Sequence, residues 1–342
     1  MSLPDRRRGV ALSLVLLAAV LGGCSSGGAS PSVAPPSASP SASAAAASPS
    51  PTEVPAFPVT LTDDEGTAVD VAAEPEKIVS LTPATTEVLF ALGAGDRVVA
   101  TDDGSEYPEE AVALPDVATF SSVDVEKVVA FEPDLVLAGG LGFTPADAIS
   151  RLRDLDVPVV VVYAPSVEGV LKDIELIGTA TGTTDTATTL TTQMRSDMDA
   201  ISDAVATQSP KPRTFYDVGY DDTTGAIYAP AADSFLAEMV TMAGGDVITT
   251  GDPNTYELPL ETLIEKDPQL IVLGTNPFYS PTPDAVAARR GWDALTAVRD
   301  DAIRPVRDIE ITRPGPRLTI GLRKENGRWV VAHEHHSFPD KS

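Results

Sequence analysis

The sequence is short of cysteine, basic residues and aromatics, and each shortage excludes something. One cysteine, Cys24, stands among 342 residues, so neither an intrachain disulfide nor a cysteine-rich zinc module can form. The 24 Lys and Arg face 50 Asp and Glu, a net charge of −26 that offers no basic surface to a nucleic acid. Aromatic residues make up only 5%, yet 43% of the chain is hydrophobic, enough for one large core or two ordinary ones. Folding therefore depends on apolar burial alone.

The first 23 residues predict an export signal. Arg6–Arg8 form a positive start, and Val10–Val20 is an uncharged apolar run too short to span a membrane as a mature helix. Leu21-Gly22-Gly23-Cys24 then places the lone cysteine after two small residues, which resembles the lipobox of bacterial lipoproteins. The resemblance implies that Cys24 becomes the lipidated first residue of the mature chain. The alternative is a chance cysteine beside an ordinary cleavage site.

Residues 24–56 predict a disordered tether. From Ser25 to Thr52 the chain is almost wholly Ser, Ala, Pro and Gly, with no charged residue and too few large apolar groups to repay the entropy of ordering. With polyproline II character this segment could extend about 80 Å at about 3.1 Å per residue. These features indicate a globular module that works outside the cytoplasm, close to a membrane.

From residue 57 on, short β-branched runs alternate with helical segments. After an edge hairpin of Val59–Leu61 and Ala68–Val71, a buried-type run at Lys77–Leu81 leads into a helix over Pro83–Leu92. Such alternation argues for a parallel sheet covered by helices on both faces. The further strands predicted in this lobe are Arg97–Thr101, Leu135–Ala138 and Val157–Tyr163, and the further helices are Val125–Phe131 and Pro145–Leu155.

An internal repeat predicts a second lobe of similar build. Glu126–Gly139 matches Glu261–Gly274 in pattern at all 14 positions: an acidic start, a short amphipathic helix, an acid-Pro or similar turn, an apolar strand and a glycine. In the same order, Val88–Leu92 resembles Glu238–Met242, and each precedes a Gly-Asp pair. The alternative is that any α/β protein repeats a helix, a proline and a strand.

A long helix is predicted between the lobes. Thr183–Gln208 contains neither Pro nor Gly, and its apolar residues recur at spacings of 3 and 4, which gives one stripe on a helix about 39 Å long. The predicted fold class is therefore α/β, with two Rossmann-like lobes of parallel sheet, 57–165 and 211–317, joined through a linking region, 166–210, by one long backbone helix. With a single helix as hinge, the lobes should close by only a few degrees.

Several motifs together resemble a known family. Lys77–Glu87, the two repeated segments, the linking helix and the run from Arg290 to Arg317 are similar to the helix-backbone class of substrate-binding lipoproteins, the class III periplasmic binding proteins, which serve ABC importers of cobalamin and ferric siderophores. The resemblance implies a monomeric, non-catalytic protein without a cofactor, which holds its ligand in a cleft between the lobes. It also implies that Glu126 and Glu261 dock to the permease; the alternative is that each acid only stabilises a helix dipole.

The expected cleft residues lie where strands end. A large corrinoid or siderophore favours aromatic faces with a few polar groups. Two of these residues, Phe120 and Arg313, match cleft positions of the family. Arg313 would meet a phosphate or carboxylate, and Arg317 is the structural alternative. Asp102 would accept from ligand amides or cap the next helix. The aromatic candidates for ligand contact are Phe120, Tyr163, Tyr216, Tyr220, Tyr228, Tyr256 and Phe278.

One departure from the family leaves the ligand open. Cobalamin-type members often carry a tryptophan just after the strand that corresponds to Leu135–Ala138, whereas Gly139–Phe143 stands there in this chain and is expected to open the cleft wall. A corrinoid and a ferric siderophore therefore both remain candidates. Haem is the weaker reading, because no His or Tyr is placed as an axial ligand.

The C-terminal segment 318–342 departs further. Family members usually end in a helix, but Asn326-Gly327 between two alternating runs predicts a β-hairpin. The segment resembles the closing hairpin of a nuclear-transport-factor-like cyclase or isomerase domain, which suggests a fusion, a frameshift or an assembly junction. All three histidines lie here, and His333 and His335 share a strand face, but an inherited strand end explains them better than a metal site.

Two other function classes are alternatives to a binding protein. An extracytoplasmic hydrolase is disfavoured because the chain has no histidine before His333, no Gly-x-Ser-x-Gly elbow, no P-loop and no dinucleotide glycine motif. A ligand sensor would share the cleft but would not need Glu126 and Glu261.

Overall fold

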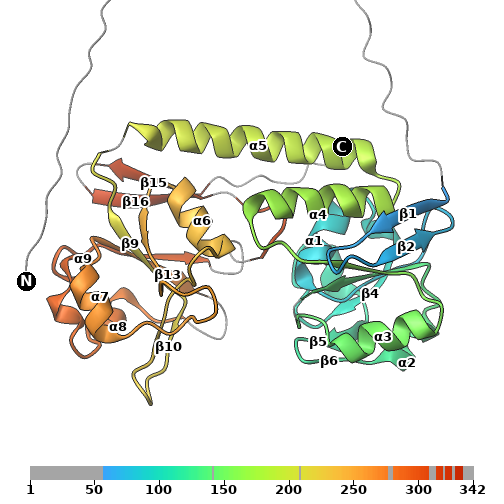
Figure 1. The fold of residues 1–342 in the computed structure, drawn as a ribbon, viewed down its shortest axis with the longest axis horizontal. Helices are drawn as coiled ribbons and strands as arrows, with labels where there is room; N and C mark the ends of the chain where they lie inside the picture. Colours follow the sequence, from blue (N-terminus) through green and yellow to red (C-terminus); the bar gives the residue numbers. More distant parts are fainter. Residues whose placement is uncertain are drawn as a thin grey trace, which may run out of the picture. The chain divides into compact units, whose positions relative to one another are not determined.

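The computed structural model describes residues 57–140, 142–207, 209–275, 280–307, 313–318, 320–325 and 328–333 (Figure 1). The predicted export signal, Cys24, the tether and Phe278 lie outside these residues. Within the described ranges, no helix is both long enough and apolar enough to cross a membrane.

The described chain begins with the predicted hairpin. Strands β1 (Val59–Thr62) and β2 (Ala68–Val71) pair antiparallel, with Val59 opposite Val71. Asp63 shapes the turn, because its Oδ1 accepts from the backbone N–H groups of Glu65 and Thr67 at 3.1 and 2.8 Å. The hairpin is thus confirmed at the place the alternation predicted.

The first lobe contains a six-stranded sheet in the order β6-β5-β4-β3-β7-β8. Every neighbouring pair in it is parallel except β5 and β6, which form a short antiparallel edge. Two of its strands, β5 and β6, were not predicted. The strands are β3 (Ile78–Ser80), β4 (Val98–Asp102), β5 (Asp116–Thr119), β6 (Ser122–Val123), β7 (Leu135–Gly139) and β8 (Val159–Val162).

Helices cover this sheet on both faces, as the buried runs predicted. On β3, Ile78 faces the core cluster that includes Leu89 of α1, and its neighbour Val79 faces the opposite cluster, which includes Val128 of α2 and Leu152 of α3. The helices of this lobe are α1 (Pro83–Ala91), α2 (Val125–Ala130) and α3 (Ala146–Asp154), with 3-10 turns η1 (Gly95–Arg97) and η2 (Glu109–Ala113).

Two helices, not one, connect the lobes. The predicted long helix is confirmed as α5 (Thr184–Ala206). Another helix, α4 (Val167–Ala180), precedes it and is separated from it by three residues. Figure 1 shows α4 and α5 running side by side. Gly178 permits this approach, because a Cβ atom there would overlap the side chain of Ala187. The linking region is therefore a packed helix pair.

The second lobe repeats the strand order of the first. Its sheet runs β12-β9-β13-β14, entirely parallel, which corresponds to β4-β3-β7-β8. Helix α2 leads into β7 as α7 leads into β13, so the repeated sequence segments occupy equivalent places and the predicted two-lobe α/β fold is confirmed. The strands are β9 (Arg213–Asp217), β12 (Asp246–Ile248), β13 (Leu270–Thr275) and β14 (Ile303–Arg307).

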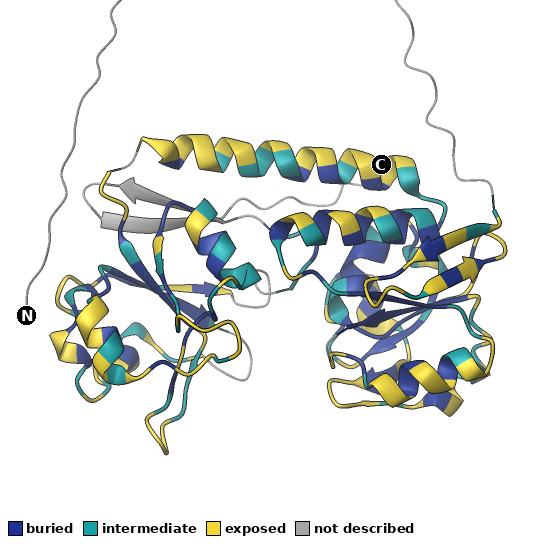
Figure 2. Cartoon of the chain, viewed as in Figure 1, coloured by how far each residue is buried: buried dark blue, intermediate teal, exposed yellow. Residues whose placement is uncertain are grey.

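Shorter elements complete the second lobe. Strands β10 (Gly219–Tyr220) and β11 (Ile227–Tyr228) form a hairpin after β9. Figure 2 shows the strands of both sheets buried and the outer helix faces exposed. The helices are α6 (Phe235–Met242), α7 (Leu260–Lys266), α8 (Pro283–Ala287), α9 (Thr296–Arg299) and the 3-10 turn η3 (Trp292–Ala294).

The C-terminal segment forms the predicted β-hairpin. Strands β15 (Ile320–Glu325) and β16 (Arg328–His333) pair antiparallel, with Glu325 opposite Arg328 on either side of the expected two-residue turn. His333 ends β16, while His335 and His336 lie outside the described residues. The resemblance of this segment to another domain family stays a prediction.

Candidate functional site

The carboxyl ends of the parallel strands define one edge of each sheet. In open α/β sheets, ligands bind outside these ends, next to the point where the strand order reverses. In the first lobe β3 and β4 end at Ser80 and Asp102, and in the second lobe β9 ends at Asp217. Polar side chains at these three positions are buried. Each edge therefore carries polar groups held inside the protein.

A chain of hydroxyl groups links the end of β3 to the loop after β4. Thr86 Oγ1 donates to Ser80 Oγ at 2.8 Å, and Thr85 Oγ1 lies 2.7 Å from the same oxygen. Thr86 Oγ1 also lies 2.8 Å from Ser105 Oγ. All four side chains are buried, so these bonds fix the first turn of α1 against the β4 loop.

Asp102 holds the same loop. Its Oδ1 accepts from Ser105 Oγ at 2.5 Å, and its Oδ2 accepts from the backbone N–H of Gly104 at 3.1 Å. Burial raises the pKa of Asp102, and these hydrogen bonds oppose that rise. Of the two roles expected from sequence, the structural one fits better, although Asp102 caps a turn and not a helix.

Glu87 is the buried acid that the sequence analysis did not single out. It is 1% exposed, and its Oε2 accepts from Arg317 Nε at 2.8 Å while its Oε1 accepts from Arg317 Nη2 at 2.5 Å. Arg313 Nη1 adds a third bond to Oε1 at 3.2 Å. Both arginines therefore bind Glu87, and the expected contact of Arg313 with a ligand stays a prediction, since one carboxylate balances only one of the two positive charges. The sequence signal that could have identified Glu87 is an acidic residue directly before the apolar residues Val88–Ala91 of α1.

Two exposed aromatics follow strand ends of the first lobe. Phe120 follows β5 and is 78% exposed, and Phe143 follows β7 and is 53% exposed. A Cβ atom at Gly139 would lie 2.9 Å from the Cβ of Phe143, so the glycine lets this aromatic fold back on the end of β7. The segment Gly139–Phe143, which was expected to open the wall of the ligand cleft, therefore carries an exposed aromatic ring at Phe143. Tyr163, after β8, is half-buried, and its N–H donates to Asp64.

Of the tyrosines predicted to contact ligand in the second lobe, two are exposed and one is buried. Tyr228 and Tyr256 are 36% and 55% exposed. The prediction that Tyr216 contacts ligand is wrong for this structure, because its ring is 1% exposed in the core shared with α6. Both faces of β9 are covered, so a side chain within the strand points into a core on either side.

Tyr220 belongs to a second ion-pair cluster that the sequence did not reveal. Arg289 Nη1 donates to Asp217 Oδ2 at 2.7 Å, and both side chains are buried. The Arg289 guanidinium carbon lies 4.2 and 4.5 Å from the ring centroids of Tyr220 and Trp292, two rings that meet edge to face. The loop after β9 is therefore fixed to η3, and Tyr220 packs on a buried cation.

The two acids of the repeat are both exposed. Glu126 and Glu261 lie in the first turns of α2 and α7, at equivalent places in the two lobes. This geometry agrees with docking and equally with a dipole role. Among the described residues, no group of three or more His, Cys, Asp and Glu could hold a metal ion.

Comparison with known proteins gives a consistent result. Residues 78–307 match the sequence profile of the periplasmic binding protein family. An uncharacterised ABC transporter substrate-binding lipoprotein of Bacillus subtilis is 32% identical over 323 residues, which cover 93% of this chain and 96% of that protein. A cobalamin-binding protein of Halobacterium salinarum is 31% identical over 273 residues, which cover 77% of this chain and 72% of that protein.

A solved structure extends the likeness to three dimensions. A protein described as an ABC-type Fe3+-hydroxamate transport system from Saccharomonospora viridis superposes with a TM-score of 0.60 at 27% identity, over 76% of this chain and 95% of that chain. This solved structure therefore shares the fold of the chain over most of its length.

Proposed function

This chain belongs to the periplasmic binding protein family as the substrate-binding component of an ABC transporter and not as an enzyme, and on this premise we propose that it captures a corrinoid outside the cytoplasm and delivers it to the permease. The Halobacterium relative is named a cobalamin-binding protein, which supports a corrinoid as the first ligand to test. Lipidation of Cys24 would keep the monomeric protein at the membrane.

One observation carries this proposal: exposed aromatics lie in the segments that come after the carboxyl ends of parallel strands in both lobes. Phe120 and Phe143 come after β5 and β7, Tyr256 lies in the segment after β12, and Tyr228 ends β11 of the hairpin that follows β9. A corrinoid has a broad, partly apolar surface with amide edges, and aromatic rings at these ends would contact its faces. The aromatic set suits that surface better than it suits a small, strongly hydrated ligand.

The ligand is tested by calorimetric titration of the protein with cyanocobalamin, cobinamide and a set of ferric siderophores. Phe120→Ala should weaken binding of the preferred ligand by about tenfold, because it removes one exposed aromatic contact. Leu155→Ala is the matched control: Leu155 is 56% exposed but precedes the amino end of β8. Equal affinity in both variants would contradict the placement of the ligand at the carboxyl ends.

A ferric siderophore is the alternative ligand. It is favoured by the absence of a tryptophan after β7 and by the likeness to the Saccharomonospora Fe3+-hydroxamate protein. If the protein binds a siderophore and neither corrinoid, its proposed role changes to iron uptake. If it binds none of the compounds, both proposed ligand classes are contradicted.

Delivery is proposed to depend on Glu126 and Glu261. Charge reversal of both, E126K with E261K, should abolish import in cells and leave ligand affinity unchanged, since both acids are exposed and neither is among the residues proposed to contact ligand. Asp199→Lys, at an exposed acid on α5, is the control. Normal import by the double variant would refute the docking role.

A further inference from the structure

The segment that follows the last strand of the second lobe is bound to the first lobe. Residues 313–318 come after β14, and Leu318, which is 2% exposed, lies in a core cluster that takes Leu89 from the first lobe and Val306 from the second. Arg313 and Arg317 in this segment reach Glu87, which lies 226 and 230 residues earlier in the chain. The C-terminal segment thus returns to α1, the helix that follows the first strand of the first lobe's sheet.

The contact is a buried ion-pair cluster of good geometry. Glu87 is 1% exposed, and the side chains of Arg313 and Arg317 are 17% and 12% exposed. Arg317 binds both carboxylate oxygens and its guanidinium stacks on the ring of Tyr107, 4.3 Å from the centroid. A buried carboxylate held by three N–H groups resists separation, because breaking the cluster would leave an uncompensated buried charge.

The cluster also holds the loop at the strand ends. Arg313 Nη2 donates to the carbonyl oxygen of Gly104 at 3.1 Å, and the N–H of Gly104 donates to Asp102. Ser105 bonds to Asp102 and to Thr86, the residue directly before Glu87. One network therefore runs from the C-terminal segment through α1 to the β4 loop.

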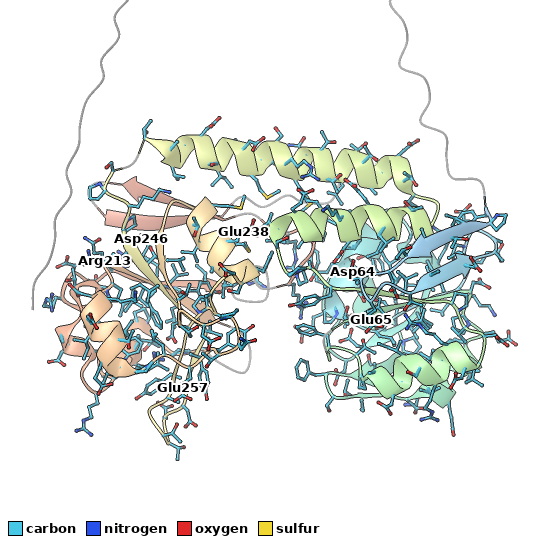
Figure 3. The ribbon with its side chains drawn as sticks, in the orientation of Figure 1. Asp64, Glu65, Arg213, Glu238, Asp246 and Glu257 are labelled. Carbon is cyan, nitrogen blue, oxygen red and sulfur yellow. The ribbon has the colours of Figure 1, made fainter. Side chains whose placement is uncertain are left out.

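Another bond joins the two lobes at the linking helices. Glu238 of α6, labelled in Figure 3, accepts from the N–H of Val167 at 2.8 Å, the first residue of α4. The N–H groups of the first turn of a helix have no partner within the helix, and Glu238 provides one for Val167 of α4. The second lobe is therefore joined to the linking helices by this side chain as well as by the covalent chain.

We propose that Glu87, Arg313 and Arg317 form a clasp that ties the end of the second lobe to the first and positions the β4 loop for ligand. This proposal rests on the proposed function, since it assigns the loop at the strand ends to the ligand site. The three residues are positioning residues: they hold the loop and the lobe connection without being the groups that touch ligand.

The test compares Arg317→Gln with Arg97→Gln. Arg97 is 21% exposed and bonds to Glu74, to Pro75 and to the carbonyl oxygen of Thr181 in the turn between α4 and α5. None of these partners lies in the second lobe, so its loss leaves the contacts of Arg313 and Arg317 in place. Spin labels at S150C on α3 and D284C on α8, in the full chain with C24S, report the distance between lobes. The distribution should broaden in the Arg317 variant and stay as in the parent for the Arg97 variant.

Affinity gives the second readout. Arg317→Gln should weaken cyanocobalamin binding by about tenfold, because a loosened β4 loop must be ordered again when the ligand binds, while Arg97→Gln binds as the parent does. Should Arg317→Gln fail to fold, Arg313→Gln is used in both measurements, since it keeps the two bonds from Arg317.

The outcomes separate the two proposals. Unchanged distance distributions in folded Arg317 or Arg313 variants overturn the clasp, whatever the ligand. If the parent protein binds neither a corrinoid nor a siderophore, the proposed function falls, and the distance measurement still decides whether the clasp ties the lobes. Changed distances with unchanged affinity would refute the positioning role at the ligand site.

Discussion

Neutralising Asp173 should stabilise the protein at neutral pH. Asp173 lies on α4 and is 8% exposed; burial, the charge of Asp64 and a hydrogen bond with that carboxyl raise its pKa from an ordinary 3.8 to about 8. Asp64 stands in the turn between β1 and β2, where its Oδ2 accepts from the N–H of Tyr163 at 2.5 Å (Figure 3). Two carboxyl groups can share a hydrogen bond only when one keeps its proton.

The sign of the pH dependence follows from this raised pKa. Between pH 3.8 and 8 the folded chain keeps a proton on Asp173 that the unfolded chain has released, so the free energy of unfolding falls as the pH rises. At pH 7 the gap from 3.8 corresponds to at most about 4 kcal/mol, at about 1.4 kcal/mol per pKa unit. Asp173→Asn removes the ionisation and keeps a group that can donate to Asp64.

The assay is denaturant unfolding of parent and variant from pH 4.5 to 8. The variant should exceed the parent least near pH 4.5 and increasingly toward pH 7, where the Tm rises by about 10 °C for a folded region of this size. Asp199→Asn, an exposed acid on α5, is the control and should follow the parent throughout. Parallel curves for Asp173→Asn and the parent would refute the shared proton.

Three further predictions concern other parts of the chain. Arg289→Gln should destabilise the fold by about 3 kcal/mol, measured by denaturant unfolding, because it removes a buried cation from the fully buried Asp217; a loss below about 1 kcal/mol would contradict this. Gly178→Val should cost about 1–3 kcal/mol by forcing α4 away from Ala187, and an unchanged Tm would show that the helices tolerate a wider gap. Cys24→Ala should move the protein from the membrane fraction to the soluble fraction of fractionated cells, and retention at the membrane would refute lipid anchoring.

Most of the fold was predictable because its signals are local. The β-branched runs became strands and the stripe over Thr183–Gln208 became α5, with ends that shift by only a residue or two. Helix α4 was not predicted, although Gly182, with a φ of 72°, separates it from α5; the linking helix was predicted only from the segment after this glycine. The repeat identified the second lobe because the matched segments lie at the same places in the strand order.

The candidate site was less predictable, since its key contacts are distant in sequence. No local pattern links Glu87 to arginines 226 and 230 residues away, or Asp217 to Arg289, which is 72 residues away. Tyr216 shows another limit of prediction from sequence. A tyrosine near the end of a predicted strand can belong to the strand and be buried between the helices that cover the sheet, or it can follow the strand and be exposed. One residue of difference in the strand end decides between core and ligand contact.

The long separation of the Glu87 and Arg317 contact also sets an order of events during folding. Pairing of β3 with β7 joins Ile78 to Leu135, 57 residues apart, whereas the contact of Glu87 with Arg317 closes a loop of 230 residues. Each doubling of loop length adds about 0.6 kcal/mol of closure entropy, so this contact costs about 1.2 kcal/mol more to close in an unfolded chain. The first sheet should therefore assemble by itself as the chain emerges, and the return of the C-terminal segment should be among the last steps, completing the protein only when both sheets are in place.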